Sequence, residues 1–247
     1  MITVVVPVLN EEENIPALLK EIAEASRAVP ISEIIYVDDG STDKSVAVLQ
    51  SLKGDYKALR VVCHSRTSGQ SAALWTGIKA AGNDIIVTLD GDGQNNPADI
   101  VHLYNLYNLY KRCAADFPKL MVAGERRKRN DVWIKRISSR LANHIRSSLL
   151  RDNTRDTGCS LKLFRRKDYL VLPYFDHMHR FLPALMIRDN VRVLHVSVSH
   201  RPRTSGVSKY GTLDRLAVGI ADLWGVWWLL KRPFAHPETA EDISEAV

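Results

Sequence analysis

The chain has 247 residues, of which 45% are hydrophobic and 25% charged, and its formal net charge is +6 at pH 7. These values are ordinary for a single globular domain with one buried core. Its three cysteines, Cys63, Cys113 and Cys159, are widely spaced and form no CxxC pair, which argues against a disulfide framework and favours a cytosolic setting.

Neither a secretory signal nor a membrane span is predicted. The chain opens on a strand pattern without the basic segment and cleavage site of a signal peptide. The longest apolar stretch, residues 216–230, contains Asp222 and is shorter than the roughly 20 residues that a membrane span needs.

The first half of the chain alternates between strand and helix patterns. Apolar, β-branched runs predict strands at residues 2–8, 33–37, 59–63 and 84–89. Helical periodicity predicts helices at residues 15–28, 44–52, 70–81 and 97–112. This alternation implies βαβ units, so we expect an α/β fold with a mostly parallel central sheet flanked by helices.

The second half is less regular. We expect strands at residues 120–123, 160–164 and 191–199. Between and after them we expect a basic helix at 133–150, a helix at 180–188 and a last helix that ends near residue 230.

Each of the first four predicted strands ends in a polar cluster. The clusters are Asn10-Glu11, Asp38-Asp39-Gly40-Ser41, His64-Ser65-Arg66 and Asp90-Gly91-Asp92. Ligands of open α/β sheets bind outside the carboxyl ends of the strands. We therefore expect these clusters to line one crevice.

Asp90-Gly91-Asp92 is a candidate site for a divalent cation. Two carboxylates at a strand end can hold Mg²⁺ and leave coordination positions for substrate phosphates. Gly91 allows the backbone to approach a ligand closely, and Gln94 lies just beyond. An ordinary turn is the alternative explanation of the triplet.

Two adjacent aspartates precede Gly40 at the end of the second strand. Ser41 or Thr42 is predicted to cap the helix that follows. One aspartate can structure the turn, and we expect the other to stay free to accept hydrogen bonds from a nucleobase or ribose.

Six motifs together carry a resemblance. Residues 7–11, 37–43 and 90–92 have the order and spacing seen in family 2 glycosyltransferases, which the chain resembles from about residue 2 to about residue 230. Residues 124–126, 156–164 and 203–210 are similar to the polyprenyl-phosphate branch of that family, typified by dolichyl-phosphate mannosyltransferase.

The resemblance implies a GT-A fold, a UDP- or GDP-sugar donor, Mg²⁺ or Mn²⁺, and inversion at the anomeric carbon. It implies that the metal is held by Asp90, Asp92 and Gln94, with Gly91 near the donor. The nucleoside pocket would be lined by Pro7, Leu9, Glu11, Val37 and Asp39, and the phosphates would be contacted by Arg126, Arg203 and Lys209. The chain departs from the family at Leu9, often aromatic in relatives, and at Ser160-Leu161-Lys162, where Gly-Phe-Arg is commoner.

The candidate catalytic residues are Asp92, Arg126 and Asp156. A cation and fixed arginines stabilise a diphosphate leaving group, whereas a phosphate-monoester acceptor, with a second pKa of about 6, needs no strong base. Asp156 could orient the acceptor, act as a base, or form a salt bridge to Arg151 or Arg155. For His179, packing is favoured over catalysis.

Residues 213–230 show an amphipathic helical pattern that includes Trp224, Trp227 and Trp228, followed by Lys231-Arg232. This pattern indicates an interfacial membrane anchor; packing on the core or in a homo-oligomer is the alternative. We therefore expect a GT-A catalytic domain at 1–211, a membrane-facing helix at 212–232 and a flexible acidic tail at 233–247.

The favoured function is transfer of a sugar to an undecaprenyl- or dolichyl-type phosphate by a protein bound peripherally to the cytoplasmic face of the inner membrane. A transferase with a polysaccharide or glycolipid acceptor is the alternative. A nucleic-acid-binding protein is disfavoured because the chain lacks a helix-turn-helix or aromatic-basic motif. A nucleotidyltransferase would need a glycine-rich loop after the first strand, where this chain has Asn10-Glu11-Glu12-Glu13.

Overall fold

The computed structural model describes residues 1–113, 119–126, 146–147, 149–150, 152–154, 156–202 and 212–232, with the backbone alone described for 212–218. Arg203, Lys209, Arg151, Arg155 and most of the basic helix predicted at 133–150 lie outside the described residues, as does the tail from residue 233.

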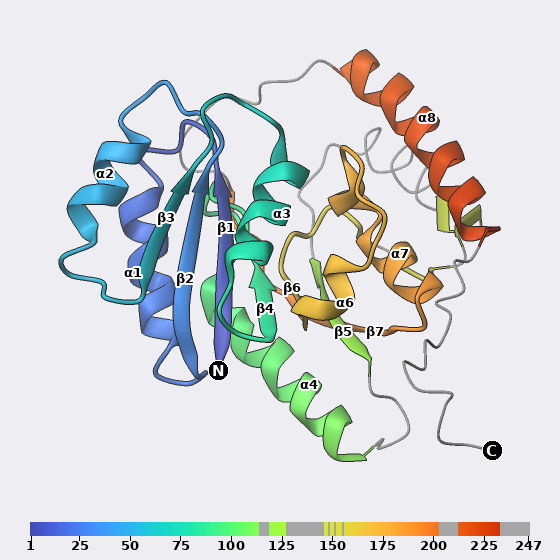
Figure 1. Ribbon diagram of the computed structural model, residues 1–247. Coiled ribbons are helices and arrows are strands. Elements are labelled where there is room, and N and C mark those ends of the chain that lie inside the picture. The colour runs from blue at the N-terminus through green and yellow to red at the C-terminus, as the bar shows by residue number, and fades with distance from the viewer. Residues whose placement is uncertain are drawn as a thin grey trace, which may run out of the picture.

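A seven-stranded sheet forms the centre of the fold, in the order β3-β2-β1-β4-β6-β5-β7 (Figure 1). Its strands are β1 Ile2–Val8, β2 Ile31–Asp38, β3 Leu59–Cys63, β4 Ile85–Thr88, β5 Leu120–Arg126, β6 Lys162–Arg165 and β7 Arg192–Val198. The pairs β1–β2, β2–β3, β1–β4 and β5–β7 are parallel, whereas β6 runs antiparallel to β4 and β5. The predicted mostly parallel sheet is confirmed.

Helices cover both faces of the sheet. They are α1 Ile15–Ala25, α2 Ser45–Leu52, α3 Gln70–Ala80, α4 Ile100–Cys113, α6 Arg166–Leu170, α7 Leu182–Arg188 and α8 Thr212–Leu230, with short 3₁₀ turns at Pro97–Asp99 and Met178–Arg180. The predicted elements in the described regions are present with small shifts at their ends. Helix α6 was not predicted, because five residues are too few for a periodic pattern to stand out.

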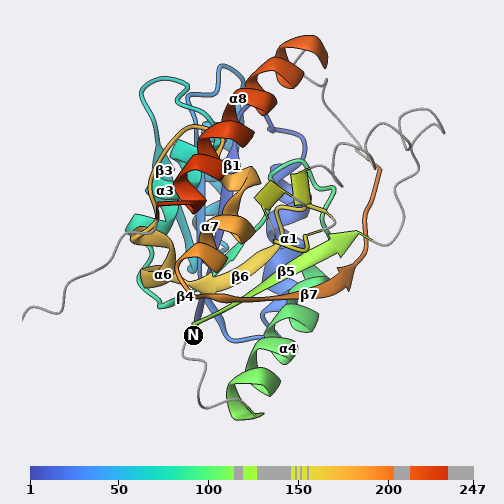
Figure 2. The ribbon, with the colours of Figure 1, turned by 90° about the vertical axis from the view of Figure 1, so that its right-hand side faces the viewer.

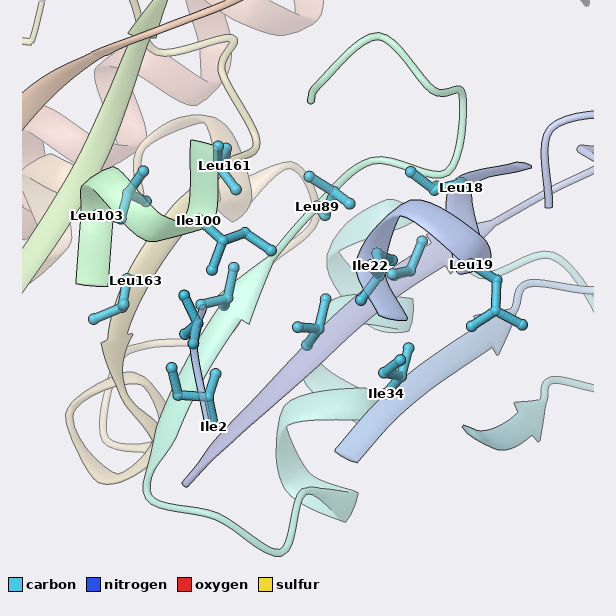
Figure 3. Packing of buried hydrophobic residues seen from close by; sticks show 14 of the residues in the cluster. Ile2, Leu18, Leu19, Ile22, Ile34, Leu89, Ile100, Leu103, Leu161 and Leu163 are labelled. Atoms are coloured by element: carbon cyan, nitrogen blue, oxygen red, sulfur yellow. The ribbon is translucent and has the colours of Figure 1, made fainter. Parts of the chain in front are cut away.

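Two apolar layers lie on opposite faces of the sheet. Successive side chains of β1 point to opposite faces of the sheet. Val4 and Val6 pack in the layer that contains α1 and α4, whereas Val5 packs in the layer that contains α3 and α7. Figure 3 shows part of the first layer, where Leu19 and Ile22 of α1 lie over the sheet. Burial on both faces explains why the parallel strands read as continuous apolar runs.

Helix α8 packs one side onto the molecule and exposes the other. Helix α8 lies beside α7 (Figure 2). Val226 is buried, and Leu223 and Trp227 pack against the layer that contains α7. On the outer side Trp224 is 59% exposed and Trp228 51%. No helix among the described residues combines the length and apolar character that crossing a membrane requires.

Candidate active site at the carboxyl edge of the sheet

Asp90 and Asp92 follow β4 and sit on a loop pressed against β1. A Cβ atom at Gly91 would lie 2.5 Å from Cγ1 of Val8 and 2.9 Å from the carbonyl oxygen of Pro7. Because a backbone carbonyl cannot swing aside, the close approach requires glycine. The two aspartates therefore reach the sheet edge on a fixed turn.

Asp90 is held from two other elements. Its backbone N–H donates to Oγ of Ser160 at 3.1 Å, and Nε2 of Gln70 donates to its Oδ1 at 2.7 Å. Burial raises the pKa of Asp90 to about 6, and the Asp92 carboxylate adds to the rise, whereas the Ser160 hydroxyl and the charge of Lys162 oppose it.

The aspartate pair fits a hard divalent cation. Two carboxylates that repel each other in a partly desolvated position are stabilised by a cation between them. No group of three or more His, Cys, Asp or Glu side chains suited to a metal occurs in the part of the chain that the structure describes. A pair of this kind matches Mg²⁺ or Mn²⁺ shared with substrate phosphates better than a closed protein cage.

Gln94 takes part in the site through its backbone. Its N–H donates to Oδ1 of Asp92 at 3.1 Å, and its carbonyl accepts from the N–H of Arg201 at 2.9 Å. Asn95 and His200 form the neighbouring bridge. The loop of residues 90–94, named the metal loop for the cation that its aspartate pair fits, is thus joined to residues 200–201 after β7.

The two aspartates at the end of β2 have separate structural roles. Asp38 Oδ2 accepts from the N–H groups of Gly40 and Ser41 and closes the turn. Asp39 accepts from Ser68 N–H at 2.9 Å, from Gly69 N–H at 2.8 Å and pairs with Nδ1 of His64 at 2.7 Å. The expectation that one carboxylate stays free is therefore wrong, because the loop after β3 folds over Asp39.

The predicted helix cap at Ser41 or Thr42 is also wrong. Helix α2 begins at Ser45, and Asp43 accepts from the N–H of Ser45 at 2.9 Å. Ser41 and Thr42 instead bind Asn10 of the neighbouring loop: Ser41 Oγ accepts from Asn10 N–H, and Thr42 N–H donates to Asn10 Oδ1. Ser41 and Thr42 therefore bond to Asn10, in the loop after β1, instead of capping α2.

Of the other residues predicted for the nucleoside pocket, three lie at the edge and one does not. Pro7, Leu9 and Glu11 are half-buried at the end of β1, and Glu11 Oε2 accepts from Nδ2 of Asn14 at 2.6 Å. Val37 is fully buried against α3, where a Cβ at Gly77 would lie 2.9 Å from its Cγ2. Its side chain supports the edge from the core and does not line an open pocket.

Arg126 and Asp156, two of the three candidate catalytic residues, form an ion pair. Arg126 Nε and Nη2 each donate to Asp156 at 2.6 Å, and the Arg126 N–H donates at 3.2 Å. The hydrogen bonds that Arg126 donates to Asp156 raise the pKa of Arg126. Lys162 is buried beside them and donates to the Cys159 carbonyl, and burial lowers the pKa of Lys162.

His179 is half-buried and hydrogen-bonded to α3, a packing role of the kind that the sequence favours. Its Nδ1 is 2.8 Å from Oγ of Ser71, and burial lowers its pKa to about 3. It is therefore a neutral hydrogen-bond partner that fixes the start of α3.

Sequence reasoning gave no individual role to Gln70, Ser160 or Lys162 of this edge, whereas His64 was expected to lie in the crevice. His64 belonged to a polar cluster already noted at a strand end, and Ser160 and Lys162 belonged to a motif already noted as unusual. Gln70 opens α3 directly after Gly69, and a polar residue at such a strand–helix junction is the signal that could have found it.

The chain is similar in sequence to enzymes named for polyprenyl phosphates. A dodecaprenyl-phosphate galacturonate synthase from Rhizobium johnstonii is 33% identical over 234 residues, which cover 93% of this chain and 67% of that protein. An undecaprenyl-phosphate 4-deoxy-4-formamido-L-arabinose transferase from Aeromonas hydrophila is 32% identical over 215 residues, which cover 86% of this chain and 64% of that protein. The chain thus spans about two thirds of the length of each of these relatives.

The fold is similar to that of glucosyl-3-phosphoglycerate synthase from Mycobacterium tuberculosis. Its complex with Mn²⁺, UDP and phosphoglyceric acid has a TM-score of 0.67 at 19% identity, covering 95% of this chain and 80% of that one. Its complex with Mg²⁺ and UDP has a TM-score of 0.64 at 21% identity, covering 94% and 79%. The likeness confirms the GT-A fold.

The family model described as Glycosyl transferase family 2 matches residues 3–171, which is more than half of the chain. This match includes the Asp39 loop, the Asp90–Asp92 pair and the Arg126–Asp156 ion pair. The chain belongs to glycosyl transferase family 2.

Proposed function

We propose that this glycosyltransferase moves a sugar from a nucleoside diphosphate sugar, with a UDP-sugar as the first choice, to a polyprenyl phosphate. The observation that carries the proposal is the Asp90–Asp92 pair, held at the carboxyl edge of the sheet beside Arg126. Its supports are the likeness to enzymes named for dodecaprenyl and undecaprenyl phosphate, and to a fold solved with UDP.

In this proposal Asp90 and Asp92 hold Mg²⁺ or Mn²⁺, with the Gln94 backbone fixing Asp92. When bound, the cation would neutralise negative charge on the departing diphosphate. Arg126 adds a fixed positive charge in a position with little solvent, where electrostatic stabilisation is strong. Arg203 and Lys209 are proposed as further phosphate contacts. Arg203 is two residues beyond Arg201 in the sequence, and the N–H of Arg201 donates to the carbonyl of Gln94 in the metal loop.

The acceptor step needs charge guidance more than a base. A phosphate monoester is already anionic at pH 7, because its second pKa is about 6. Asp156 binds the Arg126 guanidinium at two points, which supports a role in orienting that cation. We propose that Asp156 acts on the acceptor through Arg126, and that the sugar is transferred with inversion.

The nucleoside is proposed to bind near Pro7, Leu9, Glu11 and Asp39. Asp39 already accepts hydrogen bonds from the loop after β3. A base or ribose hydroxyl would therefore either share this carboxylate or displace the loop.

We further propose that α8 attaches the protein to the cytoplasmic face of the membrane. Ile220, Trp224 and Trp228 follow at intervals of four residues and are all more than half exposed. Lys231 and Arg232 lie over the rings of Trp227 and Trp228, at 3.8 and 4.7 Å, so cationic groups border the exposed aromatic stripe. Such a surface suits the headgroup region of an anionic membrane.

The test is a donor panel with purified protein, Mn²⁺ and a short-chain polyprenyl phosphate. UDP- and GDP-sugars are supplied one at a time, and nucleotide release and the mass of the lipid product are measured. We expect one sugar class to give a glycosylated lipid phosphate with wild type and none with Asp92→Ala. Lipid product that forms equally in Asp92→Ala would refute the metal assignment, and absence of product across the panel would refute the function.

A further inference from the structure

Gln70 reaches the predicted metal site from an unexpected direction. It is the first residue of α3, after β3, and β3 is separated from β4 by β2 and β1 in the sheet. Nevertheless its Nε2 donates to Oδ1 of Asp90 at 2.7 Å. Gln70 is solvent-exposed, so ordering its side chain costs conformational entropy that burial does not offset. The contact with Asp90 is what holds the side chain in place.

Both sequence neighbours of Gln70 are fixed by buried groups. Gly69 has a φ of 94°, and its N–H donates to Oδ2 of Asp39 at 2.8 Å. On the other side the hydroxyl of Ser71, a fully buried residue, is 2.8 Å from Nδ1 of His179. The backbone of Gln70 is therefore anchored, and its amide group is presented to Asp90 in a defined position.

The contact restricts how Asp90 can turn. Ser160 Oγ accepts a hydrogen bond from the Asp90 N–H and so holds its backbone, and Gln70 holds Oδ1 of its carboxylate. A carboxylate held at both its backbone and one oxygen presents its remaining lone pairs in one direction. Partners of this kind, which bind a metal ligand and not the metal, commonly change metal affinity by about 10–100-fold.

We propose that Gln70 is a positioning residue for the divalent cation, which it orders by holding Asp90 through Oδ1. This inference rests on the proposed function, because it assumes that Asp90 and Asp92 bind the cation. Segment 68–70 also joins the two carboxylates of the site, since Ser68 and Gly69 bind Asp39 while Gln70 binds Asp90. Loss of the Gln70 amide weakens cation binding through Asp90 and leaves the contacts of Asp39 in place.

The experiment measures Mn²⁺ binding to the purified full chain by calorimetric titration, with and without UDP. Gln70→Met keeps the length of the side chain and removes the amide, and Gln70→Asn keeps the amide but shortens its reach. Gln50→Met, at an exposed position on α2, is the matched control. We expect the Kd for Mn²⁺ to rise about tenfold or more in both Gln70 variants and to stay unchanged in the control.

Two further readouts separate positioning from a general defect. The thermal midpoint without metal should equal that of wild type, and the transfer rate should recover at high Mn²⁺, so that the metal requirement rises and kcat does not fall. An unchanged Mn²⁺ Kd in folded Gln70→Met, or a wild type that binds no Mn²⁺, overturns the inference. Failure of the proposed lipid transfer while Gln70→Met still weakens Mn²⁺ binding would refute the function and leave the inference standing.

Discussion

Arg126 and Asp156 face each other in a two-point ion pair, with Nε 2.6 Å from Oδ2 and Nη2 2.6 Å from Oδ1. The pair joins the end of β5 to the loop before β6, and the two side chains are 14% and 11% exposed. Two residues that the sequence assigned to phosphate binding and to acceptor chemistry thus act as one unit.

Removing either member of this pair should cost nearly as much stability as removing both. Arg126→Ala or Asp156→Ala leaves the other charge without its partner in a position with little solvent, so we expect each to lose about 3 kcal/mol. The double variant should lose scarcely more, because the second substitution removes an already unpaired charge. Urea unfolding of the four proteins measures this, and losses that simply add would show that the pair is not coupled.

Gly91→Ala should destabilise the chain and weaken Mn²⁺ binding. The new methyl group would meet Val8 and the Pro7 carbonyl, so the metal loop must move away from β1. We expect a loss of about 1–3 kcal/mol. Gly54→Ala is the control, because a Cβ there meets nothing within 4 Å, and equal stability losses in the two variants would contradict the steric account.

The half-buried His179 should make stability fall as the pH drops below about 6.5. Its pKa is lowered to about 3 in the folded chain, so between these values the unfolded chain binds a proton that the folded chain does not. From pH 7.5 to pH 5 this group should remove about 2 kcal/mol. In His179→Asn, which keeps an acceptor for Ser71, the fall measured by urea unfolding should be smaller by that amount; parallel curves would exclude the effect.

The outer side of α8 should bind anionic vesicles through its tryptophans. Trp224→Ser with Trp228→Ser removes two rings, each able to bury on the order of 100 Å² at about 25 cal/mol per Å², so binding should fall at least tenfold. Leu109→Ser is the control, because Leu109 is 60% exposed on α4, far from α8 in Figure 1. Co-sedimentation measures the bound fraction, and equal binding by the double variant would argue for another partner of this face.

Features set by local periodicity could be predicted from the sequence. The strands β1 to β4 follow from apolar runs, and placing Asp39 and Asp90 at one edge follows from the parallel topology that those runs imply. The Asp90-Gly91-Asp92 turn is predicted from its position after an apolar run, and the structure adds that its glycine meets the end of β1.

Features set by distant partners could not be predicted. Arg126 and Asp156 are 30 residues apart, and their pairing depends on how β5 and β6 align. Asn10 hydrogen-bonds the Ser41 hydroxyl and the Thr42 N–H, although the local sequence predicts that Ser41 or Thr42 caps a helix. Gln70 likewise has the pattern of an ordinary helix start until the fold brings it to Asp90.

The identity of the acceptor is the centre of the proposed function, and a competition assay tests it most directly. Wild type and Asp92→Ala receive Mn²⁺, the donor sugar nucleotide, and equal concentrations of a short-chain polyprenyl phosphate and 3-phosphoglycerate, and both products are quantified by mass. We expect the sugar on the lipid phosphate, with no product in Asp92→Ala. Sugar on phosphoglycerate, with none on the lipid, would contradict the assignment of a polyprenyl phosphate acceptor.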